Sequence, residues 1–116
     1  MTLKVEMFIK RHVLYVRFDG ELDQHNVESL RVRIIELIDK YLIKHLVLNF
    51  SKLQFMDSSG VGFIIGRYNR LKRDNGEVIL CAMNPSIKRI VMLSGLSKIC
   101  TIKADEEDVN TYLGVA

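Results

Sequence analysis

The sequence contains little that would hold a metal ion or anchor the chain in a membrane. Its 116 residues include two cysteines and one proline, and neither cysteine belongs to a C-x-x-C or Cys/His cluster. A metal site is therefore not expected. No apolar run approaches the roughly 18 residues of a membrane span, and residues 1–6 lack the hydrophobic core of a signal peptide. These absences predict a cytoplasmic protein without membrane insertion, in which Cys81 and Cys100 are reduced core residues.

A strong concentration of positive charge is also missing. The net charge is +3 and the isoelectric point is near 9.0. Basic residues gather only at Arg67, Arg70, Lys72 and Arg73, where they suit the negative end of a helix dipole. Because no basic stripe is interleaved with aromatic residues, we expect no direct contact with nucleic acid.

The chain has enough apolar residues for one core, and 48% of it is hydrophobic. We expect a single domain over residues 1–116. The expected strands cover residues 3–10, 13–19, 45–50, 78–82 and 99–102. Four helices are expected. The first follows Asp23 as its N-cap, and the second follows Asp57 and ends near residue 74. The third follows Asn84, and the fourth begins at the acidic residues 105–108. This order predicts an α/β fold: a mixed, mostly parallel sheet with an N-terminal hairpin, packed with about four helices.

A polar loop is expected after the third strand, over residues 51–57. Asp57, Ser58 and Ser59 would then lie at a helix start, where backbone N–H groups point outward and negative charge is favoured. The turn at residues 20–23 also follows a strand. If the two strands are neighbours, both turns form one surface at the carboxyl end of the sheet.

The serine pair is open to three interpretations. A nucleophile would need a base, yet the G-x-S-x-G elbow is absent and only His25 could approach Ser58. A serine at a helix start can also be a plain cap in a structural interaction domain. As a regulated hydroxyl, Ser58 could carry a phosphate that the helix start tolerates. Like charges at an interface are unfavourable, so phosphorylation would break a complex and leave the fold intact.

The glycines near this helix start do not match a nucleotide-binding loop. Gly60, Gly62 and Gly66 have the spacing G-x-G-x-x-x-G, one residue off the dinucleotide fingerprint, and no Walker lysine follows. Glycine weakens a helix interior, so close approach of another surface is the favoured explanation. We expect Gly62 and Gly66 to press on the sheet and Gly60 to admit a partner.

Three segments together resemble a known family. Residues 20–23 (GELD), 55–60 (FMDSSG) and 66–68 (GRY) are similar to a STAS domain of the anti-sigma-factor antagonist type. Residues 93–96 and 112–116 extend the resemblance over essentially the whole chain. The expected fold is therefore a single STAS domain.

The resemblance implies a switch rather than an enzyme, and no cofactor of its own. In the family, the unphosphorylated antagonist binds an anti-sigma factor that is also a serine kinase with bound nucleotide, and so releases a sporulation sigma factor. The kinase phosphorylates the residue that matches Ser58, and a PP2C-type phosphatase restores the hydroxyl. An antagonist of the general-stress anti-sigma kinase is the alternative. The implied partner-binding residues are Glu21, Asp23, Met56, Asp57, Ser58, Ser59 and Gly60.

Overall fold

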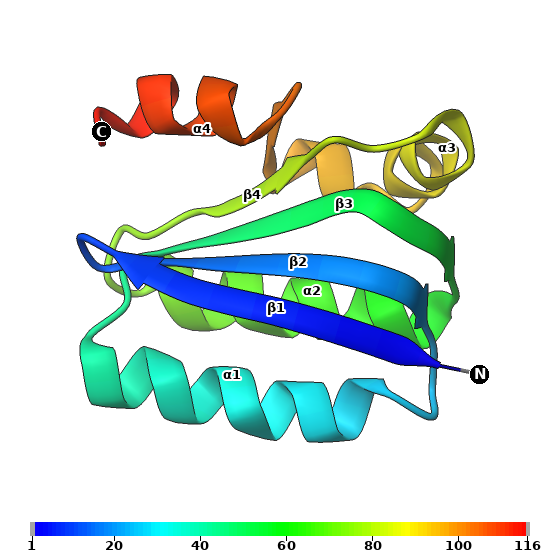
Figure 1. Cartoon of the computed structure of the whole chain (residues 1–116), viewed down its shortest axis with the longest axis horizontal. Helices are drawn as coiled ribbons and strands as arrows, with labels where there is room; N and C mark the ends of the chain where they lie inside the picture. The colour runs from blue at the N-terminus through cyan, green and yellow to red at the C-terminus, as the bar shows by residue number, and fades with distance from the viewer. Residues whose placement is uncertain (1, 116) are drawn as a thin grey trace.

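The computed structural model describes residues 2–115. Its strands are β1 (Leu3–Lys10), β2 (Val13–Leu22), β3 (His45–Met56), β4 (Val78–Cys81) and β5 (Thr101–Lys103). Its helices are α1 (Val27–Tyr41), α2 (Ser58–Lys72), α3 (Pro85–Leu93) and α4 (Glu106–Leu113), with a 3₁₀ turn, η1 (Leu96–Lys98), between α3 and β5 (Figure 1).

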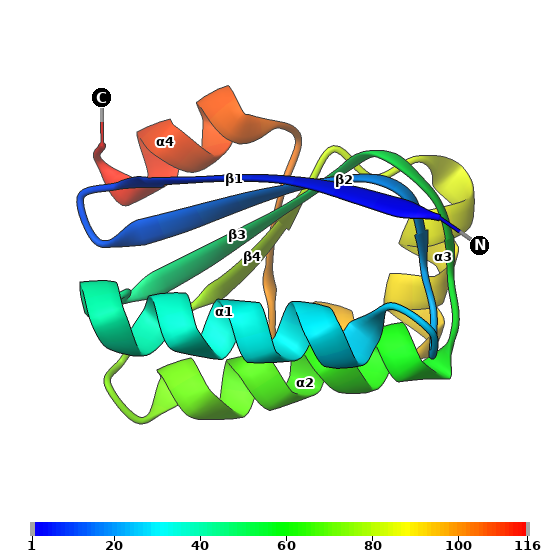
Figure 2. The ribbon, with the colours of Figure 1, turned by 60° about the horizontal axis from the view of Figure 1, so that its bottom comes forward.

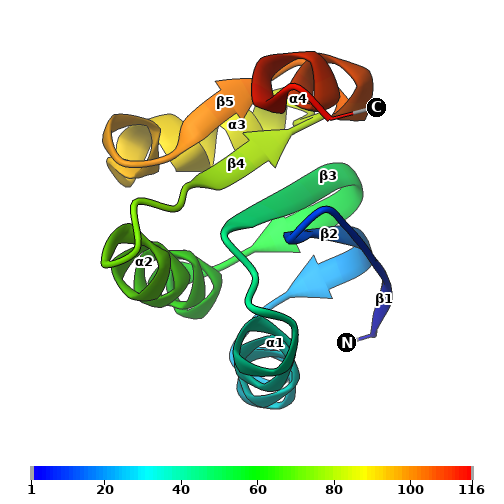
Figure 3. The same ribbon diagram turned by 90° about the vertical axis from the view of Figure 1, so that its left-hand side faces the viewer.

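The strands form one sheet in the order β1-β2-β3-β4-β5. The pair β1–β2 is antiparallel and the other pairs are parallel, as predicted. Helices α1 and α2 lie side by side on one face of the sheet (Figure 2), whereas α4 lies on the opposite face (Figure 3). The α/β prediction is confirmed, because a sheet with apolar residues on its faces must be covered by helices.

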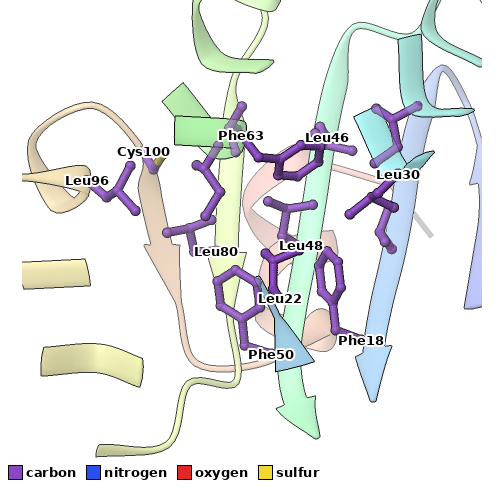
Figure 4. Packing of buried hydrophobic residues seen from close by; sticks show 14 of the residues in the cluster. Phe18, Leu22, Leu30, Leu46, Leu48, Phe50, Phe63, Leu80, Leu96 and Cys100 are labelled. Atoms are coloured by element: carbon purple, nitrogen blue, oxygen red, sulfur yellow. The ribbon is translucent and has the colours of Figure 1, made fainter. Parts of the chain in front are cut away.

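The core is divided between the two faces of the sheet, because successive strand residues point to opposite sides. The larger cluster lies under α1 and α2 and includes Phe18, Leu48 and Phe50, with the two aromatic rings 5.5 Å apart (Figure 4). A smaller cluster around Tyr15 and Cys81 lies on the other face. Cys81 and Cys100 are both free and buried, as predicted, although Cys100 precedes β5 instead of lying on it.

Two strands are longer than predicted. The expected turn from Gly20 and the expected loop at 51–57 are wrong, because β2 continues to Leu22 and β3 to Met56. These extensions pair with each other and run past β4, whose partner residues end at Asn49 of β3. Because β3 has no neighbour on its other side beyond Asn49, most side chains of its extension are exposed, and the sequence there is polar and suggests a loop.

The start of α1 also differs from the prediction. Its N-cap is Asn26, whose side chain makes no capping bond, and not Asp23. The Asp23 carboxylate instead accepts a hydrogen bond from the His25 N–H at 2.9 Å. Its carbonyl accepts from the N–H groups of Asn26 and Val27, which closes a tight turn before the helix. Asp23 therefore caps a turn rather than the helix.

None of the helices in residues 2–115 is both long and apolar enough to cross a membrane. Within the same residues, no group of three or more His, Cys, Asp or Glu side chains is arranged to hold a metal ion.

Candidate functional site

The ends of β2 and β3 lie next to each other, as the candidate surface requires. Leu22 pairs with Met56 in the parallel register. The Asp57 N–H then donates to the Leu22 carbonyl, and the Gln24 N–H donates to Asp57 Oδ2, each at 3.3 Å. These two hydrogen bonds join the segments that follow β2 and β3. The predicted single surface is confirmed. Gln24 was not predicted to contribute, because it takes part only through its backbone N–H, which no side-chain pattern reveals.

Asp57 is the N-cap of α2. Its Oδ1 accepts from the N–H groups of Ser59 at 2.9 Å and Gly60 at 3.2 Å. Asp57 therefore caps α2, a role for which the serine pair was considered in the sequence. Each carboxylate oxygen has a backbone partner, so the side chain is held between α2 and the turn before α1.

Ser58 is the first residue of α2 and is exposed, whereas Ser59 is half-buried. Within residues 2–115, the Ser58 hydroxyl has no hydrogen-bond partner of its own. Because Asp57 satisfies the first backbone N–H groups, the hydroxyl is not needed for capping. The Ser59 hydroxyl also has no partner in the described chain, so exposure is what distinguishes Ser58, which presents its hydroxyl at the positive end of a helix dipole.

Gly60 packs closely against residues of its own domain, a role that the sequence did not predict. It is buried, and a Cβ there would lie 2.5 Å from Met56 Cγ and 3.0 Å from the Leu22 carbonyl oxygen. The close approach is therefore internal, between α2 and the ends of β2 and β3. Gly62 and Gly66 are the reverse case, since a Cβ at either would meet nothing within 4 Å. Their predicted packing on the sheet is wrong.

The apolar pair before the serines is split between core and surface. Met56 is 2% exposed, while Phe55 is 42% exposed. Met56 and Gly60 are therefore buried beneath the surface that Ser58 presents, and their predicted partner contacts remain untested. Phe55 was not among the predicted contacts. Alternation from the buried Leu53 would instead have placed Phe55 in the core, and the irregular register of β2 and β3 between Leu53 and Phe55 reverses the faces.

Two acidic side chains border this surface with unused oxygen atoms. Asp23 is 2% exposed, and its Oδ2 has no partner within the described chain. Glu21 is half-buried, and its Oε2 is likewise buried without a partner there. Buried acceptors without donors are rare and unfavourable. Both atoms are inaccessible to solvent, so a molecule docked on the surface as it stands does not reach them.

The histidine considered as a general base is not coupled to the serine. The His25 ring lies 3.5 Å from Asp23 Oδ1 and its side chain is largely exposed. In residues 2–115, no histidine is hydrogen bonded to Ser58. The nucleophile–base hydrogen bond typical of hydrolases is thus not formed in the described chain.

Comparisons with known proteins agree with this architecture. The profile of the STAS domain family matches residues 4–109. The chain is 43% identical over 115 residues to the anti-sigma F factor antagonist of Paenibacillus polymyxa, covering 99% of this chain and 98% of the relative. It is 27% identical over 94 residues to the anti-sigma-B factor antagonist of Listeria monocytogenes, covering 78% of this chain and 79% of the relative.

Two solved structures of the anti-sigma factor antagonist SpoIIAA have the same fold. The unphosphorylated form is 30% identical with a TM-score of 0.77, and 97% of each chain is covered. The phosphorylated form, from Bacillus, is 32% identical with a TM-score of 0.74, covering 96% of this chain and 99% of the other. Since profile, sequence and structure agree over most of its length, the chain belongs to the STAS domain family, in the group of the anti-sigma-factor antagonists.

Proposed function

We propose that the chain is a phosphorylation-controlled antagonist of an anti-sigma factor. Unphosphorylated, it binds an anti-sigma factor that is also a serine kinase, and this releases the sporulation sigma factor. Phosphorylation of Ser58 by that kinase ends binding, and a PP2C-type phosphatase restores the hydroxyl. The chain itself catalyses no reaction. The observation that carries the proposal is the exposed Ser58 hydroxyl, free of any capping duty, at the start of α2.

The helix start is suited to a phosphate. A phosphate adds about −1.5 to −2 charges at neutral pH, and the positive end of a helix dipole stabilises an anion. Asp57 opposes this effect by repulsion, but its carboxylate is held by three backbone N–H groups and need not move. The exposed position also leaves the phosphate hydrated in the free chain. The fold should therefore tolerate phosphorylation.

A complex should not tolerate the same phosphate. The surface around Ser58 already carries the carboxylates of Asp57, Asp23 and Glu21. A bound partner would exclude water from this surface, and an unpaired dianion in such a place is strongly unfavourable. In the unphosphorylated state, the exposed Ser58 hydroxyl can instead exchange hydrogen bonds with the partner. Phosphorylation of Ser58 would then convert the form that binds the partner into the form that is released.

The sporulation anti-sigma factor is the favoured partner. The identity of 43% to an anti-sigma F factor antagonist exceeds the 27% to an anti-sigma-B factor antagonist, and covers more of the chain. SpoIIAA, the similar protein of known structure, has an unphosphorylated and a phosphorylated form. The general-stress system remains the second candidate and differs only in the kinase.

The test is to incubate the chain with each candidate anti-sigma kinase and ATP, and to map the phosphate by mass spectrometry of peptides. We expect one phosphate on Ser58, none in Ser58→Ala, and normal transfer in the matched variant Ser59→Ala. Ser58→Ala should remain bound to the kinase when ATP is added. Phosphate on Ser59, or no transfer by any anti-sigma kinase, would refute the assignment.

The phosphate-like variant separates fold from binding. Ser58→Asp should keep the melting temperature within about 2 °C of the parent, because exposed substitutions change stability by about 0.5 kcal/mol or less. It should nevertheless bind the kinase at least about tenfold more weakly, since a charge is added to a desolvated surface. A large loss of melting temperature would contradict the tolerance of α2 for charge.

A further inference from the structure

The end of the molecule remote from the candidate site exposes apolar side chains. The β1–β2 turn and the last turn of α1 lie together at this end, opposite the start of α2 (Figures 1 and 2). The Lys44 N–H donates to the His12 carbonyl at 2.7 Å, which joins the β1–β2 turn to the segment after α1. The exposed fractions of Ile9, Tyr41 and Leu42 are 38%, 44% and 74%. Because Ile9 and Tyr41 line one groove and Leu42 follows Tyr41, the three form a single surface.

Basic side chains surround these apolar residues. Arg11, Lys40 and Lys44 are exposed, and none of them forms an ion pair within residues 2–115. The Lys40 Nζ lies 5.3 Å from the centre of the Tyr41 ring, so the charge and the apolar surface are in contact. We define the tip surface by these basic and apolar residues together: Ile9, Arg11, Lys40, Tyr41, Leu42 and Lys44.

The acidic side chains near the tip surface are compensated by basic residues of α2. Asp39 and Asp74 line a groove beside Leu42, and both carboxylates bind Arg70, at 3.0 and 3.4 Å. Glu36 is exposed one turn earlier on α1, without an ion pair in the described chain. The end of α2 contributes two further exposed basic residues, Lys72 and Arg73. The tip surface therefore keeps its positive charge.

Two residues of the tip surface have a backbone conformation that favours glycine. Leu42 is the C-cap of α1 with φ 52°, and Arg11 lies in the β1–β2 turn with φ 52°. Glycine or asparagine is usual at both kinds of position. The Leu42 side chain also gains little from internal packing, because most of it is exposed. The stability of the fold therefore does not explain why a leucine and an arginine stand at these positions.

The helix dipole explains only part of the basic charge. Lys40 lies in the last turn of α1, where it complements the negative end of the dipole. Arg11 and Lys44 lie outside the helix, and the dipole accounts for neither. It also gives no reason for exposing Tyr41 and Leu42 between the charges. An apolar centre with a basic rim is instead typical of a surface that binds another molecule.

We propose that the tip surface binds the surface of a membrane that contains anionic lipids. Its basic residues are attracted to the negative headgroups, while Tyr41 and Leu42 reach the boundary between headgroups and acyl chains. The apolar area of three side chains is far below the roughly 800 Å² that each partner of a stable protein complex buries. This small area favours a lipid surface over a protein partner.

The contact is peripheral and leaves the candidate site free. The surface around Ser58 lies at the other end of the molecule and carries the carboxylates of Glu21, Asp23 and Asp57. An anionic membrane repels this end and attracts the tip surface, so Ser58 faces away from the lipid. The inference concerns a different surface from the switch proposed above and does not rest on it.

The test is co-sedimentation of the full chain with vesicles of phosphatidylcholine, with or without phosphatidylglycerol as about one lipid in three. We expect binding only to the anionic vesicles at about 0.1 M salt, and its loss at about 1 M salt. The double variant Lys40→Gln/Lys44→Gln should bind at least about tenfold more weakly, since each basic residue near the lipid contributes roughly fivefold. The matched variant Lys88→Gln/Arg89→Gln removes the same charge from exposed positions of α3 and should lose about twofold or less.

A second pair of variants tests the apolar contact without removing a charge. Leu42→Gly should bind at least about fivefold more weakly. Its melting temperature should be no lower than that of the parent, because glycine adopts a φ of 52° without strain. The matched variant Leu93→Ser removes a leucine of α3 that is 79% exposed, and it should bind like the parent.

Several results would overturn the proposal. One is the absence of binding to anionic vesicles at low salt. Others are equal losses in the two charge variants, which indicate a general attraction, and unchanged binding of Leu42→Gly. Polyglutamate is titrated in parallel as a model of an acidic protein. If it binds the tip surface and anionic vesicles do not, the surface belongs to a protein partner instead of a membrane.

Discussion

At the scale of single residues, two glycines of α2 have opposite surroundings. Gly60 is packed against Met56 and Leu22 so closely that a methyl group has no room, while Gly62 faces open space. The difference matters for the candidate site, because the packing of Gly60 fixes the position of the first turn of α2. Ser58 is presented by that turn, so its geometry depends on the internal packing of Gly60.

Gly60→Ala should therefore lower the free energy of unfolding by about 1–3 kcal/mol through overpacking. Gly62→Ala should raise it by about 0.5–1 kcal/mol, because alanine is the better helix former and meets no neighbour. Urea unfolding of the two variants beside the parent measures both effects. Equal stability of the two variants would show that the contact at Gly60 relaxes without penalty.

At the scale of elements, a polar network around Glu77, the residue before β4, joins β3, β5 and α4 at the end of the sheet remote from Ser58. The Glu77 carboxylate accepts hydrogen bonds from the hydroxyls of Thr101 and Tyr112. The Glu77 N–H donates to His45 Nδ1 at 3.0 Å. Because that nitrogen accepts, the histidine ring must be neutral for the bond to form.

This network predicts a dependence of stability on pH. Burial is the main cause that lowers the pKa of His45, with Lys44 adding to it and Glu77 opposing it. The unfolded chain then binds the proton more readily than the folded chain does. The stabilisation is present above pH 6.5 and is lost as the pH falls below that value.

Urea unfolding at a series of pH values between 8 and 5.5 measures this dependence. In His45→Gln the part of the pH dependence that arises from His45 should disappear, while the exposed His12 and His25 remain as the internal control. An identical pH profile in parent and variant would remove His45 as the cause.

At the scale of the whole molecule, the two cysteines report on opposite faces of the sheet. Cys81 belongs to the cluster under α4, and Cys100 to the larger cluster under α1 and α2. Burial raises the pKa of both thiols to about 12, so neither is a reactive thiolate at neutral pH. Their reaction with reagents requires the core to open.

If the domain unfolds cooperatively, iodoacetamide should label Cys81 and Cys100 at the same slow rate in low urea, and that rate should follow global unfolding. Mass spectrometry of peptides after quenching gives each rate separately. The unfolded chain in concentrated urea provides the reference rate. Much faster labelling of Cys100 would show that the η1 segment opens on its own.

Most of the fold was predictable because its signals are local. Alternation identified β1, the continuous apolar run identified the first half of β3, and Asn84 followed by Pro85 marked the start of α3. The structure confirms that Asn84 accepts from the Ile87 N–H at 2.9 Å. A cap or a periodic face depends on residues a few positions apart, so such features can be recognised without knowledge of the tertiary structure.

The sequence by itself thus determined the order of the elements, the position of the serine pair after β3 and the resemblance to the STAS family. Only the tertiary structure decided that Asp57 is the cap, that Gly60 packs internally and that Ser58, not the half-buried Ser59, is the exposed serine of the pair. The reason is that these features arise where the ends of β2 and β3 meet. The hydrogen bond between Gln24 and Asp57 joins residues 33 positions apart, and no local pattern encodes such a contact.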